Sequence, residues 1–246
     1  MVERTQVYFV SDVHLGLRNA DPAERERRFV DFLSGIPGNA LSVYLLGDIW
    51  DFWYEYRDVV PREGARVVAK LIALMDAGVQ VFFFPGNHDL WCFSFFESLG
   101  MIRCTQPQLV QIGGKTLCLG HGDLLGGGRA GYSFMQSIFK NKAVQAVFST
   151  LHPWFAFRLG NGWSGSNRKR RKPYHFQGDK EPLYRFALEQ SGQVHIDYFI
   201  FGHFHDAVDI QLPTGARLVV LKDWLDGGTP HALLNSATGE LTVCAR

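Results

Sequence analysis

The stretch VYLLGDIWDFW, Val43 to Trp53, decides the fold of this 246-residue chain. Its first half is an uninterrupted apolar run, which is typical of a strand buried on both faces of a parallel sheet. The run stops at Gly47, and Asp48 and Asp51 follow within four residues. Because carboxylates are costly to bury without a partner, two of them at the end of a buried strand indicate a site.

The segments on either side of this stretch contain further predicted strands and, between them, predicted helices. Short apolar runs at Val7–Val10 and Val79–Phe84 predict two more buried strands. Pro22–Leu33 and Arg62–Ala77 have the spacing of helices and lie between the strands. Strands that alternate with helices indicate an α/β architecture with a largely parallel sheet.

The second half of the chain is richer in short strands. Leu109–Ile112 and Thr116–Leu119 flank Gly113-Gly114, which predicts a hairpin. Four more short strands are predicted at Tyr198–Phe201, Ala207–Leu212, Arg217–Lys222 and Leu241–Ala245.

Between these two β regions the sequence predicts helices. Apolar residues recur there at helical spacing, as in Val144, Val147, Phe148 and Leu151, and aromatic residues follow at Trp154, Phe155 and Phe157. We therefore expect residues 124–181 to form a helical insertion, or cap, on a core made of residues 1–123 and 182–246. The basic run Arg168–Lys172 is expected to be a solvated loop.

The composition limits the function classes. A net charge of +1 gives no overall field toward nucleic acid or an anionic surface, so no nucleic-acid partner is expected. The N-terminus shows no signal-peptide pattern, and no apolar run approaches the roughly 20 residues that span a bilayer. A cytoplasmic protein is therefore expected, with buried, reduced thiols at Cys92, Cys104, Cys118 and Cys244.

Four more polar clusters end apolar runs in the same way. They are Ser11-Asp12-Val13-His14, Gly86-Asn87-His88-Asp89, Gly120-His121-Gly122-Asp123 and Gly202-His203-Phe204-His205. Because ligands bind at the carboxyl edge of α/β sheets, we expect all five clusters to meet there. Their Asp, His and Asn donors suit Mn²⁺, Fe²⁺ or Zn²⁺, and their number supports two ions that share a carboxylate. In extended backbone, residues i and i+2 point the same way, so His203 and His205 are expected to bind different ions of the pair.

The motif order D-x-H, G-D-x-x-D, G-N-H-D, G-H, G-H-x-H, which covers Asp12 to His205, resembles the calcineurin-like metallophosphoesterase superfamily. The resemblance implies an αββα sandwich of two sheets. It implies one metal on Asp12, His14, Asp48 and His205, and a second on Asp48, Asn87, His121 and His203. It also implies catalytic roles for His88, near the phosphoryl or leaving-group oxygen, and for Asp51, which would orient His88. Asp89 and Asp123 would orient backbone or ligand groups.

The texture SDVHLG, LLGDIWDFW, FFFPGNHDLW, LGHGD and AGY, followed by an aromatic and basic insertion, resembles the UDP-2,3-diacylglucosamine hydrolases of lipid A synthesis. Those enzymes use Mn²⁺ to cleave the pyrophosphate of a nucleotide-linked acylated sugar, which gives UMP and a lipid phosphate, and they associate peripherally with the inner membrane. The resemblance implies that the insertion offers an apolar groove to the acyl chains. It implies substrate contacts from Asn87, His88, Arg129, Ser166, Asn167 and Arg170.

Two other functions stay open. Well-known members of that family carry Arg at the position of His88 and an acid at that of Arg129. A related phosphatase or phosphodiesterase that acts on phosphoprotein, nucleotide or nucleic acid at the same metal site is therefore one alternative. A non-catalytic metal-binding scaffold is the other.

Overall fold

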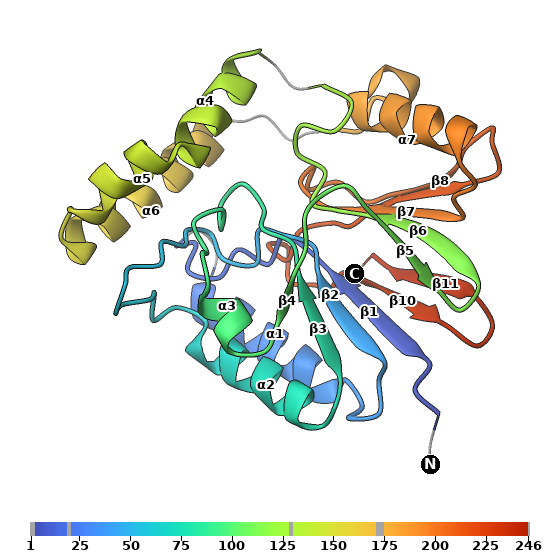
Figure 1. Ribbon diagram of the computed structural model, residues 1–246, viewed down its shortest axis with the longest axis horizontal. Helices are drawn as coiled ribbons and strands as arrows, with labels where there is room; N and C mark the ends of the chain where they lie inside the picture. The colour runs from blue at the N-terminus through green and yellow to red at the C-terminus, as the bar shows by residue number, and fades with distance from the viewer. Residues whose placement is uncertain (1–2, 19–20, 128–129, 171–174, 246) are drawn as a thin grey trace.

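Two β-sheets lie face to face with helices on their outer sides (Figure 1). The computed structural model describes residues 3–18, 21–127, 130–170 and 175–245, without the side chains of residues 161 and 163–170. The first sheet has the strand order β11 (Glu240–Cys244), β10 (His231–Asn235), β1 (Gln6–Val10), β2 (Ser42–Leu45), β3 (Gln80–Phe83) and β4 (Ile102–Arg103). The second has the order β5 (Gln108–Ile112), β6 (Lys115–Leu119), β7 (Tyr198–Phe201), β9 (Arg217–Val220) and β8 (Val208–Gln211).

The alternation of side chains along the strands produces the layers. In β1, Val7 and Phe9 belong to the core between the two sheets, whereas Tyr8 and Val10 belong to the core beneath the helices. That outer core is covered by α1 (Pro22–Gly35) and α2 (Ala65–Asp76), and the second sheet is covered by α7 (Pro182–Gln193). The αββα sandwich is therefore confirmed. The short elements α3 (Phe95–Ser98) and η1 (Gly178–Lys180) lie in connections.

Parallel pairing brings the polar clusters to one end of the sandwich. Strands β1, β2, β3 and β4 pair in parallel, and so do β6, β7 and β9. The register aligns Val10 with Leu45 and Leu45 with Phe83, so these strands end level with one another. Because parallel strands share a carboxyl edge, the segments that follow them gather there.

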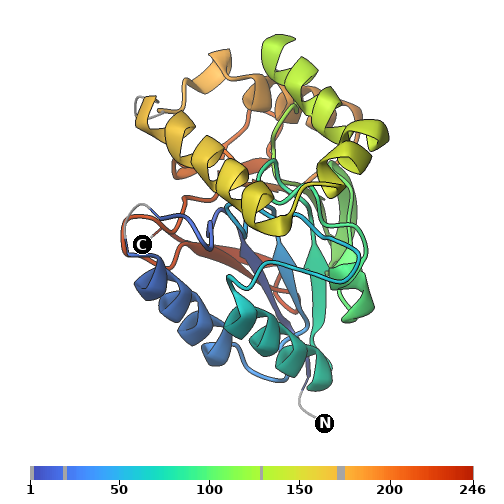
Figure 2. The same ribbon diagram turned by 90° about the vertical axis from the view of Figure 1, so that its left-hand side faces the viewer.

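Helices α4 (Ala130–Lys140), α5 (Lys142–Ser149) and α6 (Pro153–Arg170) form an arm beside that end of the sandwich (Figures 1 and 2). We use "arm" for these three helices. Asn141 caps α5, because its side-chain oxygen accepts hydrogen bonds from the backbone N–H groups of Ala143 and Val144. The prediction of a loop at Arg168–Lys172 is wrong for residues 168–170, which continue α6, and residues 171–172 lie outside the described residues.

The four cysteines are free thiols, as predicted. Cys92, Cys104 and Cys118 are buried, and Cys244 is half-buried. Among the described residues, no helix combines the length and the apolar character needed to cross a membrane.

Candidate metal centre

The sequence-predicted ligands converge at the carboxyl ends of β1, β2, β3, β6 and β7. The potential metal ligands form three groups of side chains, and within each group the ligand atoms lie within 4.8 Å of one another. They are Asp12, His14 and His205; Asp48, His121 and His203; and His14, Asp51 and His88. His203 and His205 therefore belong to different groups. The deepest members are Asp12, His14, Asp48 and His121, which are at most 1% exposed.

The first group is built around one carboxylate oxygen. The Nε2 atoms of His14 and His205 each lie 3.6 Å from Asp12 Oδ1, and the two rings stack with centroids 5.0 Å apart. These gaps are too long for hydrogen bonds, and Asp12 Oδ1 is buried without a hydrogen-bond partner among the described residues. Two ligand atoms that each bind the same ion at about 2.0–2.2 Å lie further from each other than from the ion. Their separation is then comparable to these 3.6 Å gaps, so this donor set fits a divalent ion.

The second group is a cluster of lone pairs around His121. Its Nδ1–H donates to the carbonyl of Leu46 at 2.9 Å, so in the neutral ring Nε2 carries the lone pair. This Nε2 lies 3.4 Å from Asp48 Oδ2, 3.2 Å from Asn87 Oδ1 and 3.3 Å from His203 Nδ1. Lone pairs that face one another repel unless a proton or a cation lies between them, so this donor set also fits a divalent ion.

Asp48 lies between the two groups. Its Oδ2 atom is 3.4 Å from His121 Nε2 and 4.0 Å from His14 Nε2. Its Oδ1 atom accepts a hydrogen bond from the backbone N–H of His88 at 2.8 Å, which fixes the carboxylate plane. A carboxylate in this place can bridge two ions.

The electrostatic potential of the centre favours positive charge. Burial alone would raise the pKa of Asp12 and Asp48, but the positive charges of the surrounding histidines hold both values well below the ordinary range. Burial alone would lower the pKa of His121, but the Asp48 carboxylate outweighs it and raises the value well above the ordinary one. The pKa of His203 falls to about 4, because of burial and then the charge of His121. A divalent cation is favoured by the same carboxylates.

The backbone that presents these ligands is unusual. Asp12, His14, Asp48, His203 and His205 have φ angles of 54°, 52°, 53°, 73° and 58°, in the left-handed region. Among the described residues, the sixth non-glycine residue with positive φ is Leu124. Such a conformation costs on the order of 1–3 kcal/mol per residue and is typical of functional sites. The prediction of extended backbone at His203 and His205 is therefore wrong. Both residues have left-handed φ, and they still belong to different groups of potential ligands.

The motif glycines leave room for the acids. A Cβ atom on Gly202 would overlap Ser11 Oγ and Asp12 Oδ2, and one on Gly86 would overlap Asp48 Oδ1. Asp89 ties these loops together from below, because its carboxylate accepts hydrogen bonds from the backbone N–H groups of Gly86, Asp48, Ile49 and Trp50. This is the backbone-orienting contact that the sequence predicts for Asp89.

His88 lies at the mouth of the centre with its side chain 22% exposed. Its Nδ1–H donates to the backbone carbonyl of Asp51 at 2.8 Å, which leaves Nε2 4.0 Å from Asp48 Oδ2. The Asp51 carboxylate is 3.7 Å from His88 Nδ1 and 3.3 Å from His14 Nδ1. The hydrogen bond between Asp51 and His88 is thus made by the main chain, and the carboxylate lies nearer to His14.

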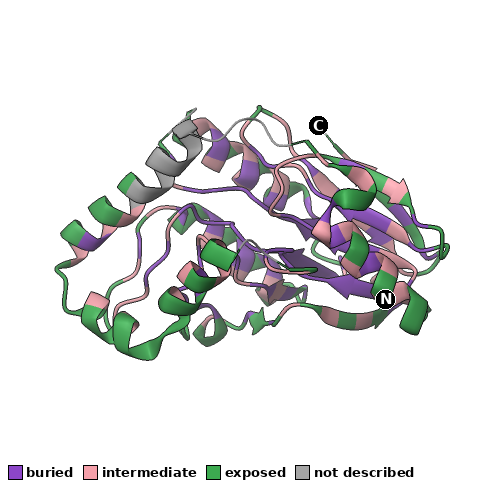
Figure 3. Cartoon of the chain, turned by 90° about the horizontal axis from the view of Figure 1, so that it is seen from above, coloured by how far each residue is buried: buried purple, intermediate pink, exposed green. Residues whose placement is uncertain are grey.

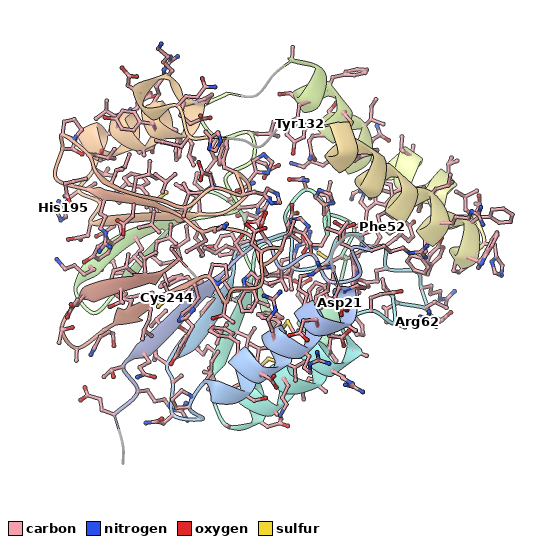
Figure 4. All side chains as sticks on the ribbon, turned by 180° about the vertical axis from the view of Figure 1, so that it is seen from behind. Asp21, Phe52, Arg62, Tyr132, His195 and Cys244 are labelled. Carbon is pink, nitrogen blue, oxygen red and sulfur yellow. The ribbon has the colours of Figure 1, made fainter. Side chains whose placement is uncertain are left out.

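The remaining predicted substrate contacts fall on or beside the arm. Arg129 lies outside the described residues, as do the side chains of Ser166, Asn167 and Arg170 on α6. Tyr132 of α4 was not predicted as a site residue, yet its ring centroid lies 6.1 Å from that of His203, on the side of α4 that faces the sheets (Figure 4). The sequence also missed Asp223, although it follows the apolar strand Arg217–Val220 just as the other acids follow theirs.

Aromatic side chains from the site loops hold the arm. Trp91 Nε1–H donates to the carbonyl of Phe139 at 2.7 Å, and Tyr54 Oη–H donates to that of Gln145 at 2.8 Å. The Phe52 ring lies against Gly160 of α6. Figure 4 shows Phe52 beside the arm. The arm is therefore fixed to the loops that carry Asp51 and His88.

The predicted apolar face of the insertion divides in two. Phe148 packs on the rings of Trp91, Tyr54 and Phe52, with centroids 4.6, 4.8 and 6.4 Å away. Most other apolar residues of the arm are exposed, and Figure 3 shows how much of its surface faces solvent. The exposed set is Phe134, Ile138, Val144, Val147, Leu151, Trp154, Phe155 and Leu159.

Comparison with known families settles the class of this centre. Residues 5–207 match the family model described as calcineurin-like phosphoesterase. The chain belongs to this family. It is therefore a metal-dependent phosphoester hydrolase, in agreement with the resemblance seen in the motifs, and it binds divalent metal.

Curated relatives cover nearly the whole chain. A UDP-2,3-diacylglucosamine hydrolase of Porphyromonas gingivalis is 36% identical over 239 residues, which are 90% of this chain and 91% of the relative. One of Aeromonas hydrophila is 29% identical over 226 residues, with 90% and 91% covered. Among solved structures, an archaeal phosphodiesterase matches with a TM-score of 0.51 and 13% identity over 97% of this chain and 98% of its own, which shows a shared fold.

Proposed function

We propose that this chain is a dinuclear-metal hydrolase that cleaves the pyrophosphate bond of UDP-2,3-diacylglucosamine into UMP and 2,3-diacylglucosamine 1-phosphate. The observation that carries the proposal is the two-group centre beside an arm with an exposed apolar surface. The names of the relatives from P. gingivalis and A. hydrophila support the choice of substrate.

The proposed ligand sets follow the two groups. Asp12, His14 and His205 would hold one ion, His121, His203 and Asn87 would hold the other, and Asp48 would bridge them. Oxygen and imidazole donors without thiolate suit Mn²⁺, with Fe²⁺ or Zn²⁺ as alternatives. Ions bound there would activate a water molecule and offset the negative charge of phosphoryl oxygens.

His88 acts on the substrate side of the centre. Because the Asp51 carbonyl holds its Nδ1 proton, His88 turns Nε2 toward the space in front of Asp48. From there His88, when protonated, stabilises a phosphoryl oxygen or protonates the departing nucleotide or sugar phosphate. Asn87 lies next to it and contributes to binding the same phosphoryl group.

The arm acts as the cap that selects a lipid-linked substrate. Acyl chains require contact with apolar surface, and exposed aromatic residues of the arm such as Phe134 and Trp154 offer it. Arg129, Ser166, Asn167 and Arg170 are proposed to contact the phosphate or sugar from the same side.

Direct assay tests this function. The purified, Mn²⁺-loaded protein should release UMP from UDP-2,3-diacylglucosamine, detected by liquid chromatography, and should leave UDP-N-acetylglucosamine, which has no 3-O-acyl chain and only a short N-acyl group, largely intact. If simple phosphodiesters are hydrolysed while the lipid-linked nucleotide is not, the chain belongs to the alternative branch of phosphodiesterases. If neither is hydrolysed while metal is bound, the scaffold alternative holds.

We further propose that the arm contacts an anionic membrane surface. Residues 124–178 contain nine Lys and Arg residues and no Asp or Glu, whereas the rest of the chain contains 16 Lys and Arg and 24 Asp and Glu. The small net charge of the whole chain is thus the sum of a basic segment, which comprises the arm and the residues that flank it, and a remainder with an excess of acidic residues. Basic residues together with exposed Trp154 and Phe155 favour binding to anionic lipid headgroups.

Vesicle binding should follow the charge of the lipid. We expect the protein to co-sediment with phosphatidylglycerol vesicles more strongly than with phosphatidylcholine vesicles, and the difference should shrink as salt shortens the Debye length. Trp154→Ser with Phe155→Ser should weaken the sedimentation while leaving hydrolysis of small phosphodiesters unchanged. Equal binding to both vesicles at low salt would contradict an electrostatic contact.

A further inference from the structure

Asp223 lies directly against one of the candidate ligands. One of its carboxylate oxygens accepts a hydrogen bond from His205 Nδ1–H at 2.6 Å, and the other accepts one from the backbone N–H of Leu225 at 3.1 Å. A proton on Nδ1 leaves the lone pair of the neutral ring on Nε2. That Nε2 atom faces Asp12 Oδ1 at 3.6 Å. Asp223 therefore selects both the tautomer and the orientation with which His205 meets Asp12.

The loop that carries Asp223 is fixed on both sides. The backbone N–H of Trp224 donates to the carbonyl of Asp12 at 3.1 Å, and its fully buried ring packs on Phe29 with centroids 5.0 Å apart. Arg28 of α1 donates to the carbonyls of Trp224 and Gly228 at 2.8 and 2.9 Å. A carboxylate on a loop held in this way is positioned before any ligand arrives.

The other histidine of the group shows a parallel arrangement. His14 also turns Nε2 to Asp12 Oδ1, and its Nδ1 lies 3.3 Å from a carboxylate oxygen of Asp51. A carboxylate on the far nitrogen of a metal-binding imidazole fixes its tautomer and raises its basicity, and loss of that partner typically costs 10- to 100-fold in metal affinity. The contact from Asp223 is the shorter of the two.

We propose that Asp223 is a positioning residue that prepares His205 to bind the ion of the Asp12, His14 and His205 group. The inference rests on the proposed function only in requiring that this group binds a divalent ion. It does not depend on the identity of the substrate.

Titration calorimetry of the metal-free full-length protein with Mn²⁺, without substrate, tests the proposal. Asp223→Ala removes the contact, and Asp223→Asn keeps the shape of the side chain while removing its charge. We expect Asp223→Ala to weaken one of two Mn²⁺ sites by about 10- to 100-fold and Asp223→Asn to weaken the same site less. The second site should keep its wild-type affinity.

Asp226→Asn is the matched control, because it makes the same change of charge on the same loop. The Asp226 carboxylate pairs with Lys222 at 2.8 Å and its side chain is 72% exposed. This variant should bind Mn²⁺ as the wild type does. Melting temperatures distinguish a positioning role from a role in folding. Without metal, Asp223→Asn should have the melting temperature of the wild type, and Mn²⁺ should raise the melting temperature of the variant less than that of the wild type.

The outcomes divide clearly. Mn²⁺ affinities that are the same in the wild type and both Asp223 variants would overturn the proposal, as would a lowered metal-free melting temperature with unchanged affinity. A wild-type protein that binds no Mn²⁺ would instead refute the metal centre of the proposed function. If Asp223→Ala does not fold, Asp223→Asn and its melting temperatures decide.

Discussion

Asp48→Ala should abolish hydrolysis and reduce the bound metal together. Asp48 Oδ2 faces both His14 and His121, so its removal takes a ligand from both groups at once. Charge stabilisation by bound metal contributes several kcal/mol to phosphoryl transfer, which corresponds to a loss of about a thousandfold or more in kcat/KM. Metal per chain by mass spectrometry and initial rates on UDP-2,3-diacylglucosamine and a small phosphodiester measure both effects.

Asp58→Ala is the control for this prediction. Asp58 lies ten residues further along the chain and is exposed, so its removal changes the net charge equally without touching the centre. It should keep wild-type metal content and rate. Full activity of Asp48→Ala with either substrate would contradict the bridging role and return Asp48 to a merely structural one.

The apolar runs predicted buried strands of a largely parallel sheet, whereas the sandwich of two sheets was implied by the resemblance of the motifs. Val43 to Leu46 reads as one apolar run because alternate residues face the helices and the second sheet. Strands β4 and β10 and helices α3 and α7 escaped prediction. Strand β10 is a short segment with a half-buried His231 at its start, and α7 has a weak apolar face in which Leu183 and Ala187 are the buried members.

The predicted ligands meet because each of them follows a strand of a parallel sheet, and the carboxyl ends of parallel strands lie at one edge. What the sequence could not predict is the backbone that presents them. Left-handed φ at His203 and His205 arises from turns held by contacts between distant segments, such as the hydrogen bond from His203 N–H to Asp12 Oδ2. Local periodicity says nothing of such contacts, so extended backbone was the wrong expectation.

The fate of the arm shows the same limit. Helical spacing predicts that residues on one side of α5 share a partner, yet Phe148 packs on the core loops while Val147 is 70% exposed. Which side of an apolar helix is covered depends on the shape of the surface beneath it. Here that surface is a cluster of rings from the loops after β2 and β3.

Gly160→Ala should lower the turnover of the lipid-linked substrate without lowering the hydrolysis of a small phosphodiester. A Cβ atom at this position would lie 2.5 Å from two carbons of the Phe52 ring, closer than real Cβ contacts come. The ring cannot turn aside easily, because Phe157 and Trp91 stand beside it with centroids 6.0 and 6.3 Å away. Overpacking of this kind costs typically 1–3 kcal/mol, so the arm should shift off the site loops.

The expected result is a fall of about 10-fold or more in kcat/KM for UDP-2,3-diacylglucosamine, since each 1.4 kcal/mol corresponds to a factor of ten. Hydrolysis of bis(p-nitrophenyl) phosphate should not change, because the metal centre keeps its own loops. Gly162→Ala is the matched control: it lies two residues along α6, where an added Cβ meets nothing among the described residues within 4 Å. Both substitutions replace Gly by Ala within α6, which favours the helix by about 1 kcal/mol in each case, so this effect is the same in the two variants.

Phe52→Ala completes the cycle. In the Gly160→Ala background it removes the ring that the new methyl group strikes, so it should restore part of the lost turnover, whereas alone it should lower turnover by emptying the same contact. Such coupling is the signature of two residues that act through one another. Equal losses on the lipid-linked and the small substrate in Gly160→Ala would mean that the arm supports the metal centre itself rather than the choice of substrate.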